Sequence, residues 1–421
     1  MKLESVELFS DFKEVIVFGT IIIVIALFSL SMEYSRYSKL VRFDDAVVDA
    51  VVLNQYDRQK DGREYQVLKL RLESGSVLYV AVGTEIRNLK GYNVKIWLKT
   101  DQIRFIDYLK GFVSTVYIDS VQRQKELRYK FYDYIASKHE NVMMQEVFGA
   151  LFAAVPMSRQ LQMRLSGFGT SHLLAISGFH LGVLSLLLFW LLRWPYAALQ
   201  HRFFPYRHGK RDLFVAIAAV LIGYVLFLDA PPSLLRAYVM LVVGYAMHDR
   251  GVKVVSMQTL LITVLLLLAL WPKLFFSIGF WLSVAGVFYI FLFLTHFAHW
   301  GRWLKFIALH FWVYMMLLPV AIYIFGIFSI VHPLSIAATM CFMIFYPLAL
   351  FFHIFGFASL LDPLLISLLE SPMQIKNITL FEGIIPLHLL LSILSVRYSI
   401  VLRVLFGSSV AVLVGAVYQI A

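Results

Sequence analysis

The chain has 421 residues, of which 60% are hydrophobic and only 15% are charged. Soluble domains usually carry about 25% charged residues, so the composition excludes an ordinary soluble protein and indicates an integral membrane protein. The formal net charge is +11, and the single cysteine, Cys341, excludes a disulfide framework and a cysteine-based metal site.

The first apolar run extends from Val15 to Leu30, is about long enough to cross a bilayer, and follows Lys13. A signal peptide has a similar pattern, but Met32-Glu33-Tyr34 offers no small-residue cleavage site. We therefore predict a retained anchor helix within residues 1–33.

Residues 34–110 have charges of both signs and short alternating stretches, which indicate a water-facing domain. The stretches "YQVLKLRLE" and "YNVKIWLK" alternate apolar and polar residues, as half-buried strands do. Three more stretches, "DAVVDAVVL", "SVLYVAV" and "QIRFI", bring the expected number of strands to about five, with turn signals at Asp61-Gly62 and Gly75. We predict a small closed β-barrel of the OB type.

Residues 111–171 mix aromatic, methionine and basic residues at helical spacing, as in "VQRQKELRYKFYDYIASKHENVMMQEVFGALFAAV". This pattern is typical of helices that lie in the membrane interface. Ordinary amphipathic helices packed on the barrel are an equally good interpretation.

Residues 172–421 contain apolar runs in close succession, which predict a polytopic helical domain. The runs are 172–192, 213–229, 233–247, 255–270, 275–295, 306–325, 331–356, a short one at 384–395, and 400–419. The expected fold is thus an α-helical polytopic membrane protein with an N-terminal anchor helix and a small external β-barrel.

Basic residues predict the orientation of this domain. The loops 193–212, 248–254 and 296–305 hold nine Lys or Arg residues, whereas the connections near 230, 272 and 328 hold only Lys273. By the positive-inside bias the first set faces the cytoplasm. The barrel is then expected on the periplasmic side of the inner membrane, with residues 1–14 inside.

The segment between Glu146 and Asp212 contains no acidic residue, but it holds seven Lys or Arg residues and four histidines. The positive-inside bias does not explain Arg159 and Arg164, because they fall on the expected outer side. A basic surface without carboxylates favours a polyanion, since phosphates release counterions when they are neutralised.

The stretch "SHLLAISGFH" places two histidines, Ser177 and Gly178 at the start of an apolar run. On one straight helix His172 and His180 are about 12 Å apart along the axis, so they cannot ligate one metal. A Ser177/His180 nucleophile pair has no nearby carboxylate to orient it. Close helix packing and a polar face that lines a water-filled passage are the other interpretations.

Two further motifs follow. In "DAPPSLLRAYVM", Ser233 can cap a helix, and Arg236 either pairs with Asp229, reaches the interface, or faces the passage and binds phosphate. In "FFSIGFWLSVAGVFYI", the spacing of Gly279, Ser283 and Gly286 indicates helix packing. We find no nucleotide-binding or metal motif, so we expect no cofactor, no metal and no ATP hydrolysis.

These motifs resemble the ComEC competence proteins, the inner-membrane channels for DNA uptake in natural transformation. "GFGTSHLLAISGFHLGVL" is similar to the most recognisable stretch of that family, "PPSLLRAYVM" to its Ser-x-x-Arg-Ala segment, and "SIGFWLSVAGV" to its Gly-Phe-x-Leu-Ser segment. The matching positions are Gly167, Gly169, His172, Leu173, Ala175, Ser177, Gly178, His180, Ser233, Arg236, Ala237, Gly279, Phe280, Leu282 and Ser283.

The resemblance implies a membrane channel that passes single-stranded DNA inward, and no enzymatic activity. Many members carry a C-terminal metallo-β-lactamase-like domain, whose metal motif this sequence lacks, so we expect a separate nuclease. The other partners implied are a periplasmic DNA receptor, a cytoplasmic ATP-driven DNA translocase and the lipid bilayer. The sequence is also compatible with a homodimer.

We expect the channel entrance to be formed by the motif residues together with the two outer arginines. These residues are His172, Ser177, Gly178, His180, Ser233, Arg236, Arg159 and Arg164, with Gly167, Gly169, Gly279, Phe280 and Ser283 in structural roles. The alternatives are an intramembrane serine hydrolase that uses Ser177 and His180, and a transporter of another anion.

Overall fold

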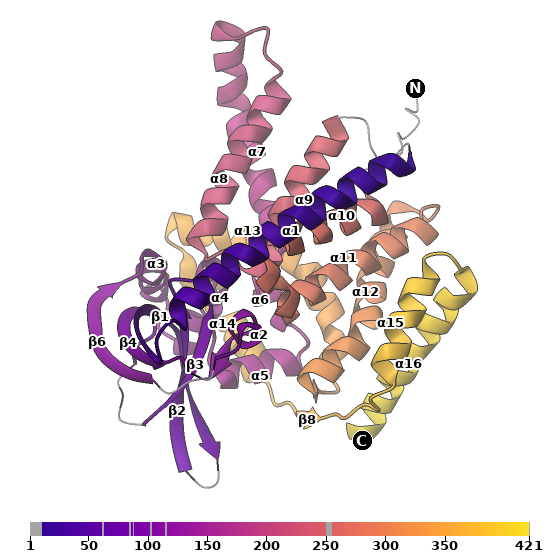
Figure 1. The fold of residues 1–421 in the computed structure, drawn as a ribbon. Helices are drawn as coiled ribbons and strands as arrows, with labels where there is room; N and C mark the ends of the chain where they lie inside the picture. Colours follow the sequence, from indigo (N-terminus) through magenta and orange to yellow (C-terminus); the bar gives the residue numbers. More distant parts are fainter. Residues whose placement is uncertain are drawn as a thin grey trace.

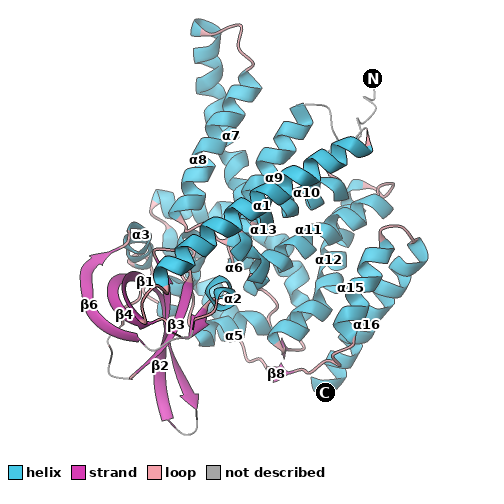
Figure 2. Cartoon of the chain, in the orientation of Figure 1, coloured by secondary structure: helices cyan, strands magenta, loops and turns pink. Residues whose placement is uncertain are grey.

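The structure is a computed structural model, and it describes residues 11–420 except 61–62, 84–85, 87, 102, 114–115 and 250–254. Helices make up most of it, and one β-sheet lies at a side of the helical bundle (Figures 1 and 2). By length and composition, six of the described helices could cross a membrane. The chain is therefore a mostly helical protein with several candidate membrane spans.

Helix α1 (Phe12–Leu40) is the first candidate span, and it continues beyond the predicted anchor. None of its residues is buried, and it runs across the face of the bundle from the sheet toward the N-terminus (Figure 1). An apolar helix with so much exposed surface is stable in lipid rather than in water. Its C-terminal end is attached to the sheet domain, where Tyr37 Oη donates to Ile103 O at 2.7 Å.

Six strands form the main sheet. They are β1 (Asp45–Lys60), β2 (Arg63–Leu72), β3 (Val77–Val82), β4 (Tyr92–Lys99), β5 (Phe112–Val113) and β6 (Val116–Lys125). The order is β5-β3-β2-β1-β4-β6, and every pair is antiparallel except β3 and β5. The predicted closed barrel is wrong: within the described residues the sheet is open, with the short β5 at one edge and β6 at the other.

Two local predictions in this domain are also wrong. The stretch "QIRFI" leads into helix α2 (Phe105–Lys110) instead of forming a strand. Strand β6 occupies a segment that was expected to be helical, because it pairs along β4, with Ile118 opposite Ile96. Strand propensity depends strongly on such cross-strand partners, which a local pattern does not reveal. The expected turn at Asp61-Gly62 lies outside the described residues.

The sheet core follows the predicted alternation. Leu68, Leu70 and Leu72 of β2 are buried, and the α2 residue Tyr108 packs with them in one apolar cluster. Successive residues of a strand point to opposite faces, so this spacing places the leucines on one face. The residues between these leucines, Lys69 and Arg71, point to the opposite face of the sheet.

The helical part follows the sheet in chain order. Its helices are α3 (Leu127–Ala136), α4 (Val142–Ala153), α5 (Arg159–Gly167), α6 (Ser171–Leu174), α7 (Gly178–Phe203), α8 (Gly209–Phe227), α9 (Pro232–Asp249), α10 (Met257–Leu270), α11 (Ile278–His296), α12 (Arg302–Phe325), α13 (Ser335–Phe355), α14 (Asp362–Glu370), α15 (Ile384–Ser395) and α16 (Ser399–Ile420). Short 3-10 turns lie at η1 (Pro272–Phe276), η2 (His332–Leu334) and η3 (Ala358–Leu361), and β7 (Ile327–Phe328) pairs with β8 (Lys376–Asn377).

Most of the predicted apolar runs correspond to helices, but their lengths differ. Helices α10 and α15 have only 14 and 12 residues, and α14 was not predicted. Helices α7 and α8 project from the bundle as a long hairpin (Figure 1). Part of the predicted basic loop at 248–254 lies outside the described residues. The periplasmic position of the sheet stays a prediction.

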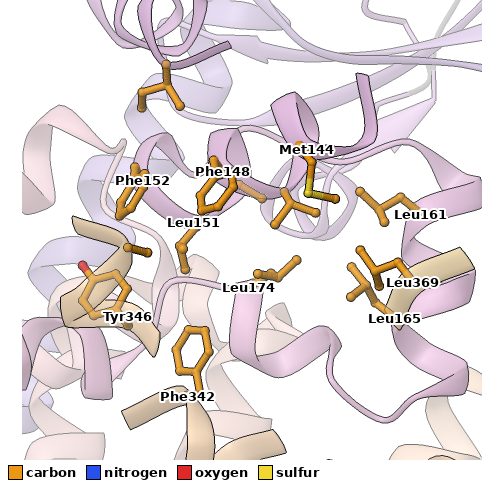
Figure 3. Close-up of a cluster of buried hydrophobic side chains, with 14 of the residues drawn as sticks. Met144, Phe148, Leu151, Phe152, Leu161, Leu165, Leu174, Phe342, Tyr346 and Leu369 are labelled. Atoms are coloured by element: carbon orange, nitrogen blue, oxygen red, sulfur yellow. The ribbon is translucent and has the colours of Figure 1, made fainter. Parts of the chain in front are cut away.

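Helix α4 is neither an interfacial helix nor a helix packed on a barrel, the two alternatives considered for residues 111–171. Eight of its 12 residues are buried, and Phe148 and Phe152 pack in a core with Phe342 and Tyr346 of α13 (Figure 3). The helix therefore belongs to the interior of the helical part. Its high apolar content is explained by this burial on several sides rather than by an interface with lipid headgroups.

An ionic cluster connects the sheet domain to the loop between α8 and α9. Asp229 in this loop pairs with Arg71 of β2, and its Oδ2 atom accepts from Arg128 Nη1 of α3 at 2.9 Å. Arg71 also donates to Glu126 Oε1 at 2.8 Å. Because Asp229 precedes the motif helix α9, this cluster places the start of α9 relative to the sheet.

Two lysines make further connections of the same kind. Lys273 of η1 lies 2.9 Å from Glu33 Oε2 of α1 and donates to Ser74 O at 2.9 Å. Lys90 donates to Pro156 O, and burial lowers the pKa of Lys90 below its ordinary value. The sheet domain is thus attached to the segments that precede α5, α9 and α11.

We expect Asp229→Asn to destabilise the protein by about 3 kcal/mol, because the buried Arg128 loses its carboxylate partner and Arg71 keeps only Glu126. Asp229 has φ +65°, a conformation that asparagine also adopts readily, so the substitution removes charge without backbone strain. Thermal unfolding of the purified protein in detergent measures the change. The matched control is Asp212→Asn, whose partner Arg207 is 55% exposed; a loss of stability as large as that of Asp229→Asn would contradict this interpretation.

Candidate functional site where three motif segments meet

The helix predicted to begin at His172 is interrupted. Helix α6 is a single turn, Ala175 and Ser177 have extended backbone angles, and α7 begins only at Gly178. The prediction of one continuous helix is wrong, because Ser177 acts as the N-cap of a new helix. His172 and His180 therefore belong to different helices, and their separation does not follow from helical spacing.

Ser177 and His180 form the cap of α7. The Ser177 Oγ atom accepts from Phe179 N at 3.3 Å, and His180 Nδ1 lies 3.1 Å from both the N and Oγ atoms of Ser177. A backbone N–H can only donate, so Nδ1 accepts and the ring proton is on Nε2. Nε2 is buried and has no hydrogen-bond partner in the described residues. The His180 ring meets Tyr346 edge to face, with centroids 4.5 Å apart.

The second motif segment packs directly on this cap. Ser233 was predicted to cap its own helix. Instead, Ser233 Oγ donates to Ile176 O at 2.8 Å and so binds the extended segment before α7. A Cβ on Gly178 would lie 3.1 Å from Ala237 Cβ and 3.4 Å from Arg236 Nη2. Any larger residue at position 178 would require α7 and α9 to move apart slightly.

The third motif segment joins the other two through Arg236. Arg236 is only 5% exposed, its Nε atom donates to Ser283 Oγ of α11 at 2.8 Å, and its Nη1 atom lies 3.4 Å from Met240 Sδ. Residues of "SGFH", "SLLRA" and "GFWLS" therefore meet around one guanidinium. Ser283, expected to serve helix packing, instead accepts a hydrogen bond from the arginine.

Arg236 has no carboxylate partner in the part of the chain that the structure describes. Asp229, the predicted alternative partner, is held by Arg71 and Arg128 instead. A buried cation without a counterion is energetically costly. The arrangement therefore favours an anionic ligand, and guanidinium groups match phosphate oxygens well.

A small cavity lies beside this junction. His172 Nε2 is 3.3 Å from Thr339 Oγ1 at its wall. The volume is about 160 Å³, which corresponds to roughly five water molecules, so it does not hold a nucleotide. Its polar lining residues are His172, Ser177, His180, His310 and Thr339. They do not form a metal-binding group, since no such group occurs among the described residues.

The glycines that precede this site lie in close contact with neighbouring segments. Gly169 has φ +70°, and a Cβ there would lie within 3.0 Å of the His332 ring. Gly167 O accepts from Ser329 Oγ at 2.6 Å, and a Cβ on Gly167 would lie 2.8 Å from Met373 Cε. Both positions thus require close approach between α5 and the segments around η2 and β8.

The Ser177/His180 pair has a distance suitable for nucleophilic catalysis, but its other contacts indicate a cap. The Nδ1 atom that faces Ser177 Oγ also accepts from the Ser177 backbone. No carboxylate orients the ring in the described residues, because Nε2 has no partner there. The capping role explains the pair without a chemical reaction.

Other predicted residues lie apart from the junction. Arg159 is exposed, and Arg164 donates to Leu369 O of α14, so neither lines the cavity. Phe280 is fully buried in the apolar core. Gly279 has room for a methyl group, since the nearest atom to a Cβ would be Ser277 Oγ at 4.0 Å. No close contact among the described residues supports the predicted packing role of Gly279.

The sequence alone does not indicate that Arg236 contacts Ser283, or that His310, Thr339 and Tyr346 lie near the site. Ser283 lies on α11, and the other three lie on α12 and α13, far from "SHLLAISGFH" in the chain. Their neighbours are apolar, and no spacing rule links them to the motifs. The sole signal was the occurrence of Ser283 in a motif that resembles a known family segment.

We expect Gly178→Val to lower the stability by about 1–3 kcal/mol, because its side chain would push against Ala237 and Arg236. Gly279→Val is a matched control, since Gly279 also lies in a first helical turn but has open space beside it. Thermal unfolding in detergent compares the two variants. Equal stability of the two would show that α7 and α9 do not pack closely.

A protein-family model described as Competence protein matches residues 154–418, a region that includes all three motif segments. No curated protein and no solved structure matches the chain. The matched region excludes the main sheet and includes the complete junction around Arg236. Because the match covers more than half of the chain, the protein belongs to the Competence protein family, the family of the ComEC proteins.

Proposed function

We propose that this protein is an inner-membrane channel that transports single-stranded DNA into the cytoplasm during natural transformation. Membership of the Competence protein family supports a role in DNA uptake. The observation that carries the proposal is the buried Arg236 guanidinium without a carboxylate partner in the described residues. A phosphate of a DNA backbone supplies the negative charge that this guanidinium lacks.

The charge pattern around the junction supports the same ligand. Residues 147–211 contain seven Lys or Arg residues and no acidic residue, so a passing phosphate meets little repulsion from this segment. His172 and Ser177 line the cavity, whose lining does not include Arg236, and they can donate hydrogen bonds to phosphate oxygens. Arg159, which is exposed, serves as an outer contact in this proposal.

Transport of a strand requires the junction to open. The cavity of about 160 Å³ is too small for a nucleotide, so the structure corresponds to a closed form in this proposal. The extended residues between α6 and α7 separate two rigid helices and can change conformation at small cost. We place the sheet domain on the periplasmic side, in agreement with the positive-inside distribution of the loops.

The proposal includes partners that the chain itself does not supply. A periplasmic receptor would deliver the DNA, a cytoplasmic ATP-driven translocase would pull the strand, and a separate nuclease would degrade the second strand. Two alternative functions are compared with this proposal in the experiments below. One is a channel for other anions, and the other is a hydrolase with Ser177 as the nucleophile.

Arg236→Ala is expected to reduce the uptake of labelled single-stranded DNA by reconstituted vesicles at least tenfold, because a phosphate contact worth about 1.4 kcal/mol or more is lost. Arg236→Lys keeps the charge and should retain part of the uptake. The matched control is Arg397→Ala, which removes an exposed arginine between α15 and α16. Unchanged uptake by folded Arg236→Ala protein, with a cytoplasmic translocase supplied, would contradict the role of Arg236.

Competition separates the alternatives. If phosphate or chloride at millimolar concentration abolishes DNA uptake and is itself transported, the protein is a channel for small anions. Labelling by a serine-reactive probe that disappears in Ser177→Ala would instead favour the hydrolase. For the DNA channel we expect neither result.

A further inference from the structure

A second cluster of titratable side chains lies away from Arg236. It contains His139 in the turn between α3 and α4, His353 near the end of α13, and Asp362, the first residue of α14. His139 Nδ1 is 3.0 and 2.9 Å from the two Asp362 carboxylate oxygens, and His139 Nε2 is 3.0 Å from His353 Nε2. His353 Nδ1 lies 2.7 Å from Ala349 O.

The hydrogen bonds determine where the protons are. A carbonyl oxygen only accepts, so His353 Nδ1 carries a proton and the neutral ring accepts at Nε2. His139 Nε2 must then donate to His353. His139 Nδ1 faces a carboxylate and donates as well. With Asp362 ionised, both ring nitrogens of His139 carry protons, and the cluster contains an imidazolium next to a carboxylate.

Aromatic rings pack against the cluster, and Gln145 Nε2 donates to the backbone oxygen of His139 at 2.9 Å. The His139 side chain is fully buried, Asp362 is 7% exposed, and the Phe148 ring of α4 stacks on His139 with centroids 4.4 Å apart. Phe148 and Phe152 also face His353, whose electrostatic partners are His139 and Asp362. His353 is half-buried, so it is the most exposed member of the cluster.

We propose that Asp362, His139 and His353 form a buried proton-binding site in which one proton moves between the two histidines. In this step the Nε2–H bond of His139 breaks as an Nε2–H bond forms on His353. His139 becomes neutral, His353 becomes the imidazolium, and Asp362 remains a carboxylate, so the total charge does not change. The site does not depend on the role of Arg236.

The occupancy of this site affects packing between distant segments. The three side chains connect the α3–α4 turn to the hairpin of α13 and α14. When the proton leaves, two Nε2 lone pairs face one another across 3.0 Å unless His353 gives up its bond to Ala349 O. The hydrogen bond between the two rings therefore needs the proton, and loss of the proton weakens the contact between these segments.

Nitrogen-15 NMR of histidine-labelled protein in detergent tests the protonation state. We expect one ring with two protonated nitrogens, whose signals disappear in His139→Asn and become those of a neutral ring in Asp362→Asn. The control is His388→Asn, which removes a buried histidine bonded to Tyr289 Oη and Met316 O. If His139 is a neutral ring from about pH 5 to about pH 9 in the wild-type protein, the proposal is wrong.

Thermal unfolding across the same pH range provides a second test. The difference in stability between the wild type and Asp362→Asn should shrink as the pH rises, since Asp362→Asn lacks the carboxylate that retains the proton. His388→Asn should parallel the wild type at every pH. A constant difference between the wild type and Asp362→Asn would mean that Asp362 has a purely structural role, and would overturn the proposal.

Discussion

The buried guanidinium of Arg236 is the contact on which the arrangement of the helical part depends. It bonds to Ser283 of α11 and lies against Gly178 at the start of α7. Three segments separated by long stretches of chain are therefore held at one point. An arginine at this depth without a carboxylate partner in the described residues is unfavourable unless another anion compensates it.

The sheet domain constrains this junction from outside. The Asp229 cluster holds the loop that precedes α9, and Lys273 holds the turn that precedes α11. The starting points of two motif helices are thus connected to the sheet by charged side chains rather than by apolar packing alone. A displacement of the sheet would move both helices that contribute to the Arg236 contacts.

The two polar clusters in the helical part differ in chemistry. The one around Arg236 has an excess of positive charge and a small adjoining cavity, which suits an anionic ligand. The one around His139 contains its own carboxylate and is neutral overall, which suits the binding and transfer of a proton. Helix α13 contributes to both, through Thr339 near its start and His353 near its end.

Much of the architecture was predictable because it depends on local properties. The length of apolar runs indicated the anchor and the helical domain, and the alternation in β2 indicated its buried face. The three motif segments indicated the residues of the junction. What no local pattern contained were the partners, since Arg236 and Ser283 are 47 residues apart and His139 and Asp362 are 223 apart.

The sequence by itself therefore determined most of the apolar helices, which face of a strand is apolar, and which polar residues occur in apolar surroundings. The tertiary structure decided that the sheet stays open, because β6 extends the edge beside β4 instead of allowing closure. It decided that Asp229 binds Arg71 and Arg128, which leaves Arg236 without a carboxylate partner among the residues that the structure describes. Hydropathy and capping act over a few residues, whereas the pairing of charges and strand edges depends on groups brought together only by folding.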